Sequence, residues 1–83
     1  MGETQVGTIK IGQLLLGAGL LTGADLAEAL EIATESGQLI GRVLVMSGFV
    51  SEEQLKAGLS LQEKLRLNQI SIDQAIKELT KYR

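Results

Sequence analysis

A chain of 83 residues with a net charge of −2 and 45% hydrophobic residues has the size and composition of one small folded domain, which excludes a disordered tail. It contains no cysteine and no histidine, so disulfides and thiolate chemistry are excluded and the commonest metal ligand is missing. The basic residues are scattered and the aromatic residues are limited to Phe49 and Tyr82, a composition that argues against a nucleic-acid-binding surface.

One pattern of apolar residues and glycines occurs twice, at 11–33 and at 40–62, with an offset of 29 residues and no gap. Gly12 aligns with Gly41, for example, at the start of each copy. A repeat of this length usually forms one supersecondary unit that buries its apolar face against a neighbour. We therefore predict two helix–turn–helix units that pack on each other.

The first unit follows a polar stretch, 1–7, that we predict to be flexible. The next apolar residues have the i, i+3, i+4, i+7 spacing of one helical face: Ile11, Leu14, Leu15 and Ala18. Thr8 is a candidate cap for this short helix. Gly19 is expected to end it, because glycine readily adopts the left-handed conformation that follows a helix end.

A second helix is predicted to begin at Thr22, with Asp25 three residues later in a capping-box pattern, and to end at Ser36-Gly37. Its expected apolar stripe consists of Leu26, Ala29, Leu30 and Ala33. We interpret its acidic residues as a solvated face: Asp25, Glu28, Glu31 and Glu35.

The second unit repeats this plan. Its short helix ends at Gly48, and Ser51 with Gln54 caps a fourth helix, in which Glu52 and Lys56 are placed to form an i, i+4 ion pair. The apolar face of the short helix is expected to be Ile40, Val43 and Leu44. The stripe of the fourth helix is expected to be Leu55, Leu59, Gln62 and Leu65 or Arg66.

A third, shortened unit follows, in which Asn68 takes the place of the glycine and Ser71 with Gln74 forms another capping box. Its amphipathic face consists of Ile72, Ala75, Ile76 and Leu79. The sequence therefore predicts an all-α fold of five helices in one domain, 1–83. The domain is built from two tandem helix–turn–helix repeats, 9–36 and 38–67, and a C-terminal closing helix, 71–82.

No group of residues predicts catalysis, because the chain has no serine beside a candidate base and no phosphate-binding loop. We expect a protein that is not an enzyme and has no cofactor or metal site. Gly12, Gly41 and Gln62 are the informative exceptions. A glycine inside a helix costs about 0.5–1 kcal/mol relative to alanine, so two at equivalent positions indicate a close approach to the backbone, by another helix or by a ligand. Gln62 falls on the apolar stripe, where its amide would bond inside the protein or face a ligand.

At these residues the chain resembles the N-terminal, MshE-type domain of type II secretion and type IV pilus assembly ATPases. That family carries paired segments of the form R-L-G, spaced leucines, a glycine, an apolar pair and L-x-x-x-L-x-x-Q. The first copy here has Lys10-Ile11-Gly12, Leu15, Gly19, Leu20-Leu21, Leu26, Leu30 and Ala33. The second has Leu39-Ile40-Gly41, Leu44, Gly48, Phe49-Val50, Leu55, Leu59 and Gln62, and the two cover about two thirds of the chain.

The resemblance implies one of two roles, since some members of the family bind cyclic di-GMP across both segments and others dock onto a membrane-platform partner. It would place the nucleotide on Lys10, Ile11, Gly12, Leu26, Leu30, Ile40, Gly41, Leu55, Leu59 and Gln62. The arginine of the family is Lys10 in one copy and Leu39 in the other, and Ala33 replaces one glutamine. The scaffold is therefore retained, while three of the four polar positions differ.

We therefore predict a non-catalytic docking or regulatory module of a secretion- or pilus-type assembly, with the acidic second helix as a steering rim. Its protein partner is expected to bind apolar surface left at Leu16, Val45, Met46 and Phe49. The alternatives are a cyclic di-GMP receptor and a structural, self-associating helical module that forms a homo-oligomer.

The longest apolar run is too short for a membrane span and no secretory signal is visible, so we expect a cytoplasmic protein without direct membrane insertion. A partner could recruit it to the inner face of the membrane. The ATPase region that usually follows this type of domain is not part of the sequence, which makes the chain either a fragment or a stand-alone adaptor.

Overall fold

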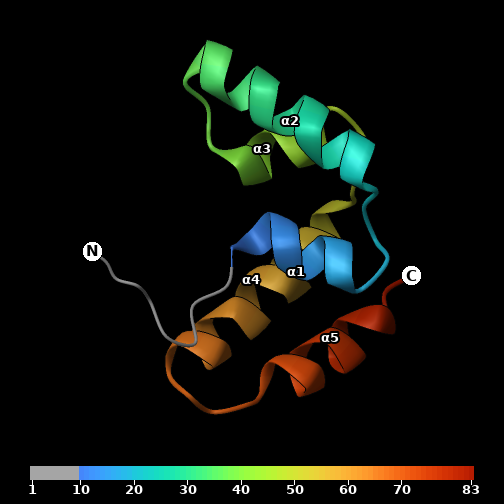
Figure 1. The fold of residues 1–83 in the computed structure, drawn as a ribbon, viewed down its shortest axis with the longest axis vertical. Helices are drawn as coiled ribbons and strands as arrows, with labels where there is room; N and C mark the ends of the chain where they lie inside the picture. Colours follow the sequence, from blue (N-terminus) through green and yellow to red (C-terminus); the bar gives the residue numbers. More distant parts are fainter. Residues whose placement is uncertain (1–9) are drawn as a thin grey trace.

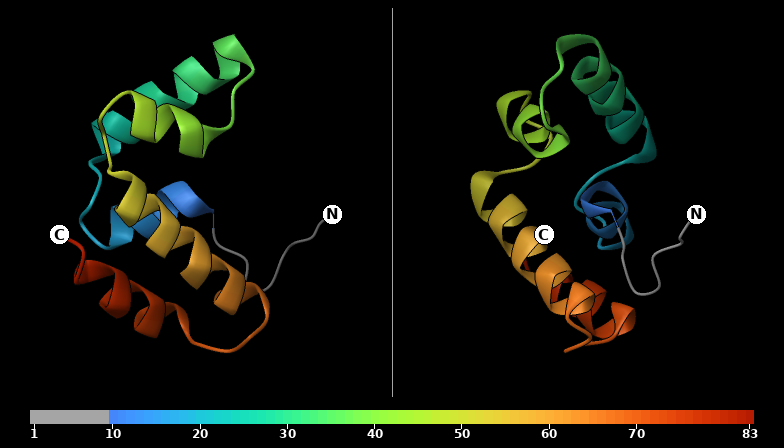
Figure 2. Two further views of the ribbon diagram at one scale, coloured as in Figure 1. Left: turned by 180° about the vertical axis from the view of Figure 1, so that it is seen from behind. Right: turned by 90° about the vertical axis from the view of Figure 1, so that its left-hand side faces the viewer.

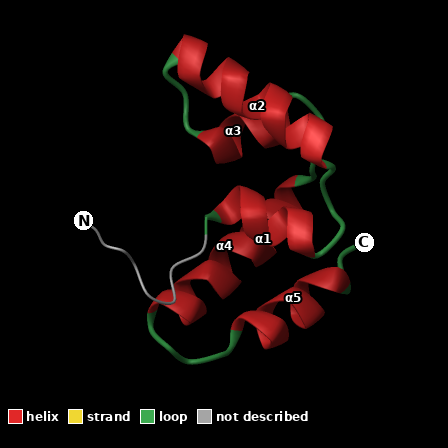
Figure 3. Cartoon of the chain, in the orientation of Figure 1, coloured by secondary structure: helices red, strands yellow, loops and turns green. Residues whose placement is uncertain are grey.

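Five α-helices follow one another along the chain in the computed structural model, which describes residues 10–83 (Figure 1). They are α1 (Ile11–Gly17), α2 (Gly23–Ser36), α3 (Ile40–Met46), α4 (Glu52–Arg66) and α5 (Ile72–Thr80). No strand occurs among the residues described (Figure 3), so the prediction of an all-α domain of five helices is confirmed. The predictions for 1–7 and for Thr8 concern residues outside that range. The N-cap of α1 is Lys10, which makes no side-chain cap bond.

The short helix α1 lies at the centre of the domain and contacts each of the other four helices. In Figure 1, α2 and α3 lie above it and α5 below it, and the reverse view in Figure 2 shows α4 crossing its other side. By contrast, α2 contacts only α1 and α3, and α5 contacts only α1 and α4. The largest fully buried side chains are Leu14, Leu15, Val43, Leu44 and Leu79. Because α1 and α3 supply most of these, the two short helices form the centre of the shared core.

Three helices end in the same way, as the sequence predicts. Gly19, Gly48 and Asn68 have left-handed φ values of 77°, 78° and 60°. After α1, the Gly19 N–H donates to the Leu16 carbonyl at 3.0 Å and the Leu20 N–H donates to the Leu15 carbonyl at 3.0 Å. This pair of bonds is a Schellman motif, and the same pair recurs after α3 and after α4. Each reversal therefore satisfies carbonyls that a helix end would otherwise leave unpaired.

Three helices also begin with the predicted hydroxyl caps. Thr22 accepts a hydrogen bond from the Asp25 N–H at 3.0 Å, and Ser51 accepts one from the Gln54 N–H at 3.0 Å. Only the cap of α4 is a complete capping box, because the Ser51 N–H also donates to Gln54 Oε1 at 2.8 Å. A hydroxyl at each of these positions pairs one of the free N–H groups at the helix start.

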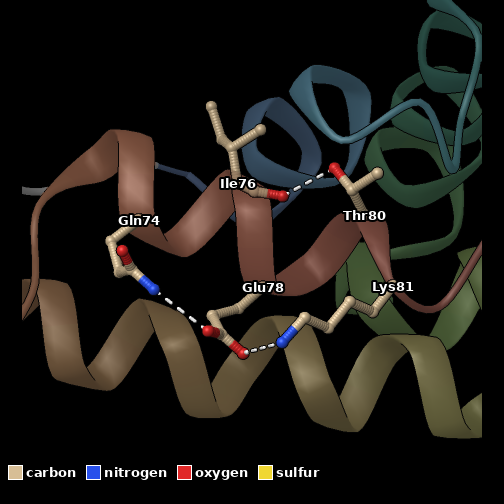
Figure 4. Close-up of polar contacts among 5 residues, drawn as sticks. All are labelled: Gln74, Ile76, Glu78, Thr80 and Lys81. Atoms are coloured by element: carbon tan, nitrogen blue, oxygen red, sulfur yellow. Dashed lines mark hydrogen bonds and ion pairs between the residues drawn. The ribbon is translucent and has the colours of Figure 1, made fainter.

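The capping box predicted at Ser71 forms only in part. The Ser71 hydroxyl accepts from the Gln74 N–H at 3.1 Å. The Gln74 side chain, however, donates to Glu78 Oε2 at 3.0 Å, one turn further along the helix (Figure 4). The other oxygen of that carboxylate accepts from Lys81 at 3.3 Å (Figure 4). The bond from the Gln74 amide nitrogen to the charged carboxylate of Glu78 directs the side chain along the helix, and its amide oxygen does not accept from the Ser71 N–H.

The buried face of α4 differs from the predicted stripe. Its buried residues are Gly58, Leu61 and Leu65, whereas Leu59 is 45% exposed. On α2 only Ala29 is buried, and Leu30 is 48% exposed. The predicted stripes are confirmed at Ala29 and Leu65 and are wrong at Leu30 and Leu59. Small residues, rather than these two leucines, mark where one helix crosses closely over another.

The predicted ion pair between Glu52 and Lys56 is absent from the part of the chain that the structure describes. The ion pairs found there have an i, i+3 spacing and join Glu63 to Arg66 and Glu78 to Lys81. The hydrogen bond from Arg66 lowers the pKa of Glu63 from its ordinary value, and the same bond raises the pKa of Arg66. Both side chains of this pair are exposed, so the pair contributes little to stability.

Candidate functional site

The glycines near the starts of α1 and α3 are approached by leucines of their own repeat. A Cβ atom added at Gly12 would lie 2.6 Å from Leu26 Cδ1, and one added at Gly41 would lie 3.3 Å from Leu55 Cδ2. These contacts are equivalent under the 29-residue offset of the repeat. Of the two interpretations that the sequence left open, close approach by another helix accounts for both glycines.

A further close approach, between α1 and α4, has no counterpart among the sequence predictions. A Cβ atom at Gly58 would lie 2.8 Å from Ile11 Cδ1, and Gly58 itself is buried. Its equivalent in the first repeat is Ala29, which is 0% exposed. Gly58 and Ala29 are small residues at equivalent positions of the two copies. This pattern in the sequence indicates the helix crossing at Gly58, which was not among the predictions.

The ten residues that the resemblance assigns to a nucleotide do not line one cavity. Ile11 and Gly12 are buried in the core. Five are half-buried: Leu26, Ile40, Gly41, Leu55 and Gln62. Three are exposed: Lys10, Leu30 and Leu59. Of the ten, only Leu55 lines a sizeable hollow on the surface of the described residues.

This hollow is an open groove of about 470 Å³ between α3 and the first turns of α4. We call it the α3–α4 groove. Its lining consists of three apolar side chains, Val45, Met46 and Leu55, and three charged ones, Arg42, Glu52 and Lys56. Met46 is 68% exposed, which leaves a large and flexible apolar side chain in contact with water. A lining that combines apolar side chains with a few charged groups is typical of binding sites.

Arg42 and Lys56 are the charged residues of this groove that the sequence predictions overlooked. Both are exposed, and neither takes part in an ion pair with another described residue. Arg42 lies three positions beyond Leu39, which takes the place of the arginine of the family motif, and Lys56 was assigned to a pair with Glu52. The spacing along α4 was compatible with that pair, but only the packing of α3 beside α4 places the two cations at one groove.

The structure brings together two of the four residues predicted to dock a partner. Val45 and Met46 both line the α3–α4 groove. Leu16 is the equivalent of Val45 on α1 and is 39% exposed, but it does not contribute to the groove. Phe49 is half-buried and packs against the core. The predicted docking surface is therefore divided, and of its four residues Val45 and Met46 line the groove.

The acidic residues of α2 form a separate surface. Glu28, Glu31 and Glu35 are exposed and Asp25 is half-buried, and none of them lines the α3–α4 groove. A smaller recess of about 190 Å³ lies between α4 and α5, where Glu78 is already bonded to Gln74 and Lys81. Within residues 10–83, no three acidic side chains gather into an arrangement that could hold a metal ion.

Comparisons with protein families, characterised proteins and solved structures find no match to this chain. No helix in the described range has the length and apolar character needed to cross a bilayer.

Proposed function

We propose that this chain is a non-catalytic docking module that binds another protein through the α3–α4 groove. The observation that carries the proposal is the groove itself, in which Met46 is 68% exposed beside Val45 and Leu55. An exposed apolar patch with a charged edge has the character of an interaction surface. Methionine suits such a surface because its flexible thioether adapts to the shape of a partner.

The sequence resemblance suggests the setting for this function. It implies a component of a secretion- or pilus-type assembly, and a partner that would hold the module at the inner face of the membrane. The groove favours docking over the nucleotide role, because the residues of the resembling motif are mostly taken up by packing. Gly12 against Leu26 and Gly41 against Leu55 are the clearest examples.

Site-specific photocrosslinking tests the proposal. A photoreactive amino acid is placed at Met46 in the groove and, as a control, at the exposed Thr34 on α2. In cells that produce the chain naturally, Met46 is expected to yield one adduct, identified by mass spectrometry, and Thr34 is expected to yield none. The adduct should disappear when Arg42 and Lys56 are both changed to Glu. Equal labelling from both sites, or no adduct at Met46, would contradict the docking function.

A second candidate is a receptor for cyclic di-GMP, favoured by the charges of the groove. Its volume of about 470 Å³ falls in the range of small-molecule sites, roughly 300–1,000 Å³. Arg42 could stack on a base and Lys56 could neutralise a phosphate. A thermal-shift titration with cyclic di-GMP tests this candidate, because a ligand at a hundredfold excess over its Kd stabilises the folded protein by about 2.7 kcal/mol. No shift at millimolar nucleotide, or an equal shift in R42A, removes this candidate.

A further inference from the structure

The two helix–turn–helix units of the repeat are interlocked. The first unit consists of α1 and α2, and the second consists of α3 and α4. Within each unit, the long helix meets the start of the short helix, where Leu26 lies against Gly12 and Leu55 lies against Gly41. The more extensive contacts join the two units, because α2 packs on α3 and α4 packs on α1. The two long helices do not contact each other.

The crossing of α4 over α1 shows how far one unit depends on the other. A Cβ atom at Gly58 would lie 2.8 Å from Ile11 Cδ1 and 3.4 Å from Leu15 Cδ2, so the second unit covers apolar side chains of the first. Ala29, the equivalent of Gly58 on α2, is 0% exposed, and α2 has its most extensive contacts with α3. Exchanging α1 with α3 and α2 with α4 therefore reproduces the pattern of contacts among the four helices, as in a two-fold arrangement.

Two equivalent units in a two-fold arrangement have the geometry in which two separate molecules form a dimer. Such a chain can make the contacts between its units internally or with a second copy, so that the first unit of each chain packs on the second unit of the other. The helix α5 follows α4 and packs on α1 and α4, so it would stay with the second unit and cover α1 of the other copy. All helix contacts are then kept, and only the segment that joins the units changes.

This joining segment, residues 37–39, has the features of a hinge. It connects the end of α2 to the start of α3 at the outer edge of the domain (Figure 1). All three residues are exposed, and a Cβ atom at Gly37 would have no atom within 4 Å. The φ of Gly37 is 74°, and glycine can leave this conformation for an extended one without steric cost. The segment can therefore open without loss of packed contacts.

Leu39 favours the pairing with a second copy. It is 80% exposed, the highest value among the large hydrophobic residues described, and the equivalent residue before α1 is the charged Lys10. When two chains exchange units, their hinges pass each other at the two-fold axis, where each Leu39 lies beside its copy. Burial of this pair of leucines is a favourable contact that the closed monomer lacks. We infer that two copies of the chain exchange units through the 37–39 hinge and form a dimer.

The exchanged dimer keeps the α3–α4 groove intact, because both walls of the groove belong to the second unit. Each dimer therefore has two grooves, and a partner with two binding segments would gain avidity from binding both. The inference goes beyond the proposed docking function. Its tests change no residue of the groove, so the two proposals can fail separately.

A mixing experiment tests the exchange on the full chain. Leu15→Ala damages the first unit and Leu44→Ala damages the equivalent position of the second, and both leucines are 0% exposed. The two variants are unfolded and refolded together at millimolar concentration, in urea that unfolds each variant alone but leaves the wild type folded. In an exchanged dimer, one pair of units is then undamaged. The mixture is expected to recover up to about half of the wild-type helical signal by circular dichroism, since one of the two pairs can fold.

The matched control is a mixture of Leu14→Ala with Leu15→Ala. Leu14 is also 0% exposed, and both substitutions damage the first unit, so no exchange of units can give an undamaged pair. This mixture is expected to recover no helical signal. Equal recovery in the two mixtures, or no recovery when Leu15→Ala is mixed with Leu44→Ala, would overturn the inference.

Analytical ultracentrifugation tests the contribution of the hinge. The wild-type chain is expected to be dimeric at millimolar concentration, and Leu39→Lys should weaken the dimer at least about tenfold, because the buried pair of leucines is lost. Leu67→Lys is the control, since Leu67 is 47% exposed but follows α4 and does not join the two units. Circular dichroism verifies that both variants are folded. A monomeric wild-type chain, or an equal effect of the two lysine substitutions, would contradict the exchange through this hinge.

Discussion

At Asn68 the chain reverses with a φ of 60°, the conformation that glycine adopts at Gly19 and Gly48 in the other two units. Asparagine tolerates this region better than most residues, but its Cβ still carries a steric cost that glycine avoids. The Schellman bonds after α4 are formed all the same, with the Gln69 N–H donating to the Lys64 carbonyl at 2.8 Å. The hydrogen bonds of the reversal therefore do not depend on which of the two residues occupies the position.

Asn68→Gly is expected to stabilise the domain by up to about 1 kcal/mol, since it removes the steric cost and keeps the bonds. Asn68→Ala should destabilise it by about 1 kcal/mol, because alanine disfavours the left-handed region more strongly. Urea denaturation followed by circular dichroism measures both. If the Asn68→Ala variant is as stable as the wild-type protein, the residue at this position does not adopt the left-handed conformation.

The glycines of the two short helices should respond differently to alanine. Alanine raises helix stability by about 0.5–1 kcal/mol over glycine, but at Gly12 its Cβ would meet Leu26 at 2.6 Å, against 3.3 Å to Leu55 at Gly41. We expect G12A to be less stable than G41A by about 1 kcal/mol, because overpacking costs roughly 1–3 kcal/mol. Thermal unfolding compares them. Adding L26A to G12A should recover part of the clash energy, and G41A serves as the control.

At the scale of helices, the start of α4 and the end of the chain are joined by a single side chain. Gln54 accepts from the Ser51 N–H with its oxygen, and its amide nitrogen donates to the Tyr82 carbonyl at 3.0 Å. One residue thus completes a helix cap and attaches the segment that follows α5. The equivalent residue in the first repeat, Asp25, has no amide hydrogen to donate.

Gln54→Glu should separate these two roles. The carboxylate keeps an acceptor for the Ser51 N–H and suits the positive end of α4, so global stability is expected to change by less than about 0.5 kcal/mol. The bond to the Tyr82 carbonyl is lost, and amide exchange at residues 81–83 should become faster. Gln54→Ala loses both bonds and should cost about 1 kcal/mol. Unchanged exchange at the chain end in Gln54→Glu would show that the bridge contributes nothing there.

At the scale of the whole molecule, the core is one unit because α1 contributes to every part of it. Neither α2 nor α3 contacts α5, and α2 does not contact α4 either. The pair α2 and α3 is therefore linked to the pair α4 and α5 largely through α1. Leu14 and Leu15 on this helix are both 0% exposed. A substitution that weakens the packing of α1 should therefore destabilise the helices on both sides of it together.

Leu15→Ala is expected to cost about 2–5 kcal/mol, the usual range for a fully buried leucine, and to lower the stability of α2 and α5 together. Leu59→Ala is the matched control, since Leu59 is 45% exposed and its loss should cost less than about 1 kcal/mol. Hydrogen exchange resolved by residue measures both variants. Separate unfolding of α2 and α5 in Leu15→Ala would contradict a core shared through α1.

The parts of this fold that could be predicted from the sequence are those decided by neighbouring residues. Thr22, Ser51 and Ser71 begin helices and Gly19 and Gly48 end them, because cap bonds and left-handed turns depend on a few residues in a row. The repeat then predicted the number and kind of helices.

Packing between distant helices could not be predicted in this way. Leu59 follows the helical period and yet is half exposed, while Gly58 carries the crossing with Ile11. The covering of α1 by α5, and the gathering of Arg42 and Lys56 at one groove, likewise depend on tertiary arrangement. Of the predicted docking residues, Val45 and Met46 lie together because they are adjacent in the sequence. Leu16 would join them only if the end of α1 reached the α3–α4 groove, and it does not line that groove.

The bridge from Gln54 to the Tyr82 carbonyl has a practical consequence for observing the groove. Gln54 lies in the same first turns of α4 as Glu52, Leu55 and Lys56, so the bridge holds the Tyr82 carbonyl against the helix that forms one wall of the groove. Because the chain has no cysteine, Arg83→Cys would create a unique attachment point for a dye at that position. A probe there would sense an arriving partner through its own change in fluorescence, with the groove residues left unaltered.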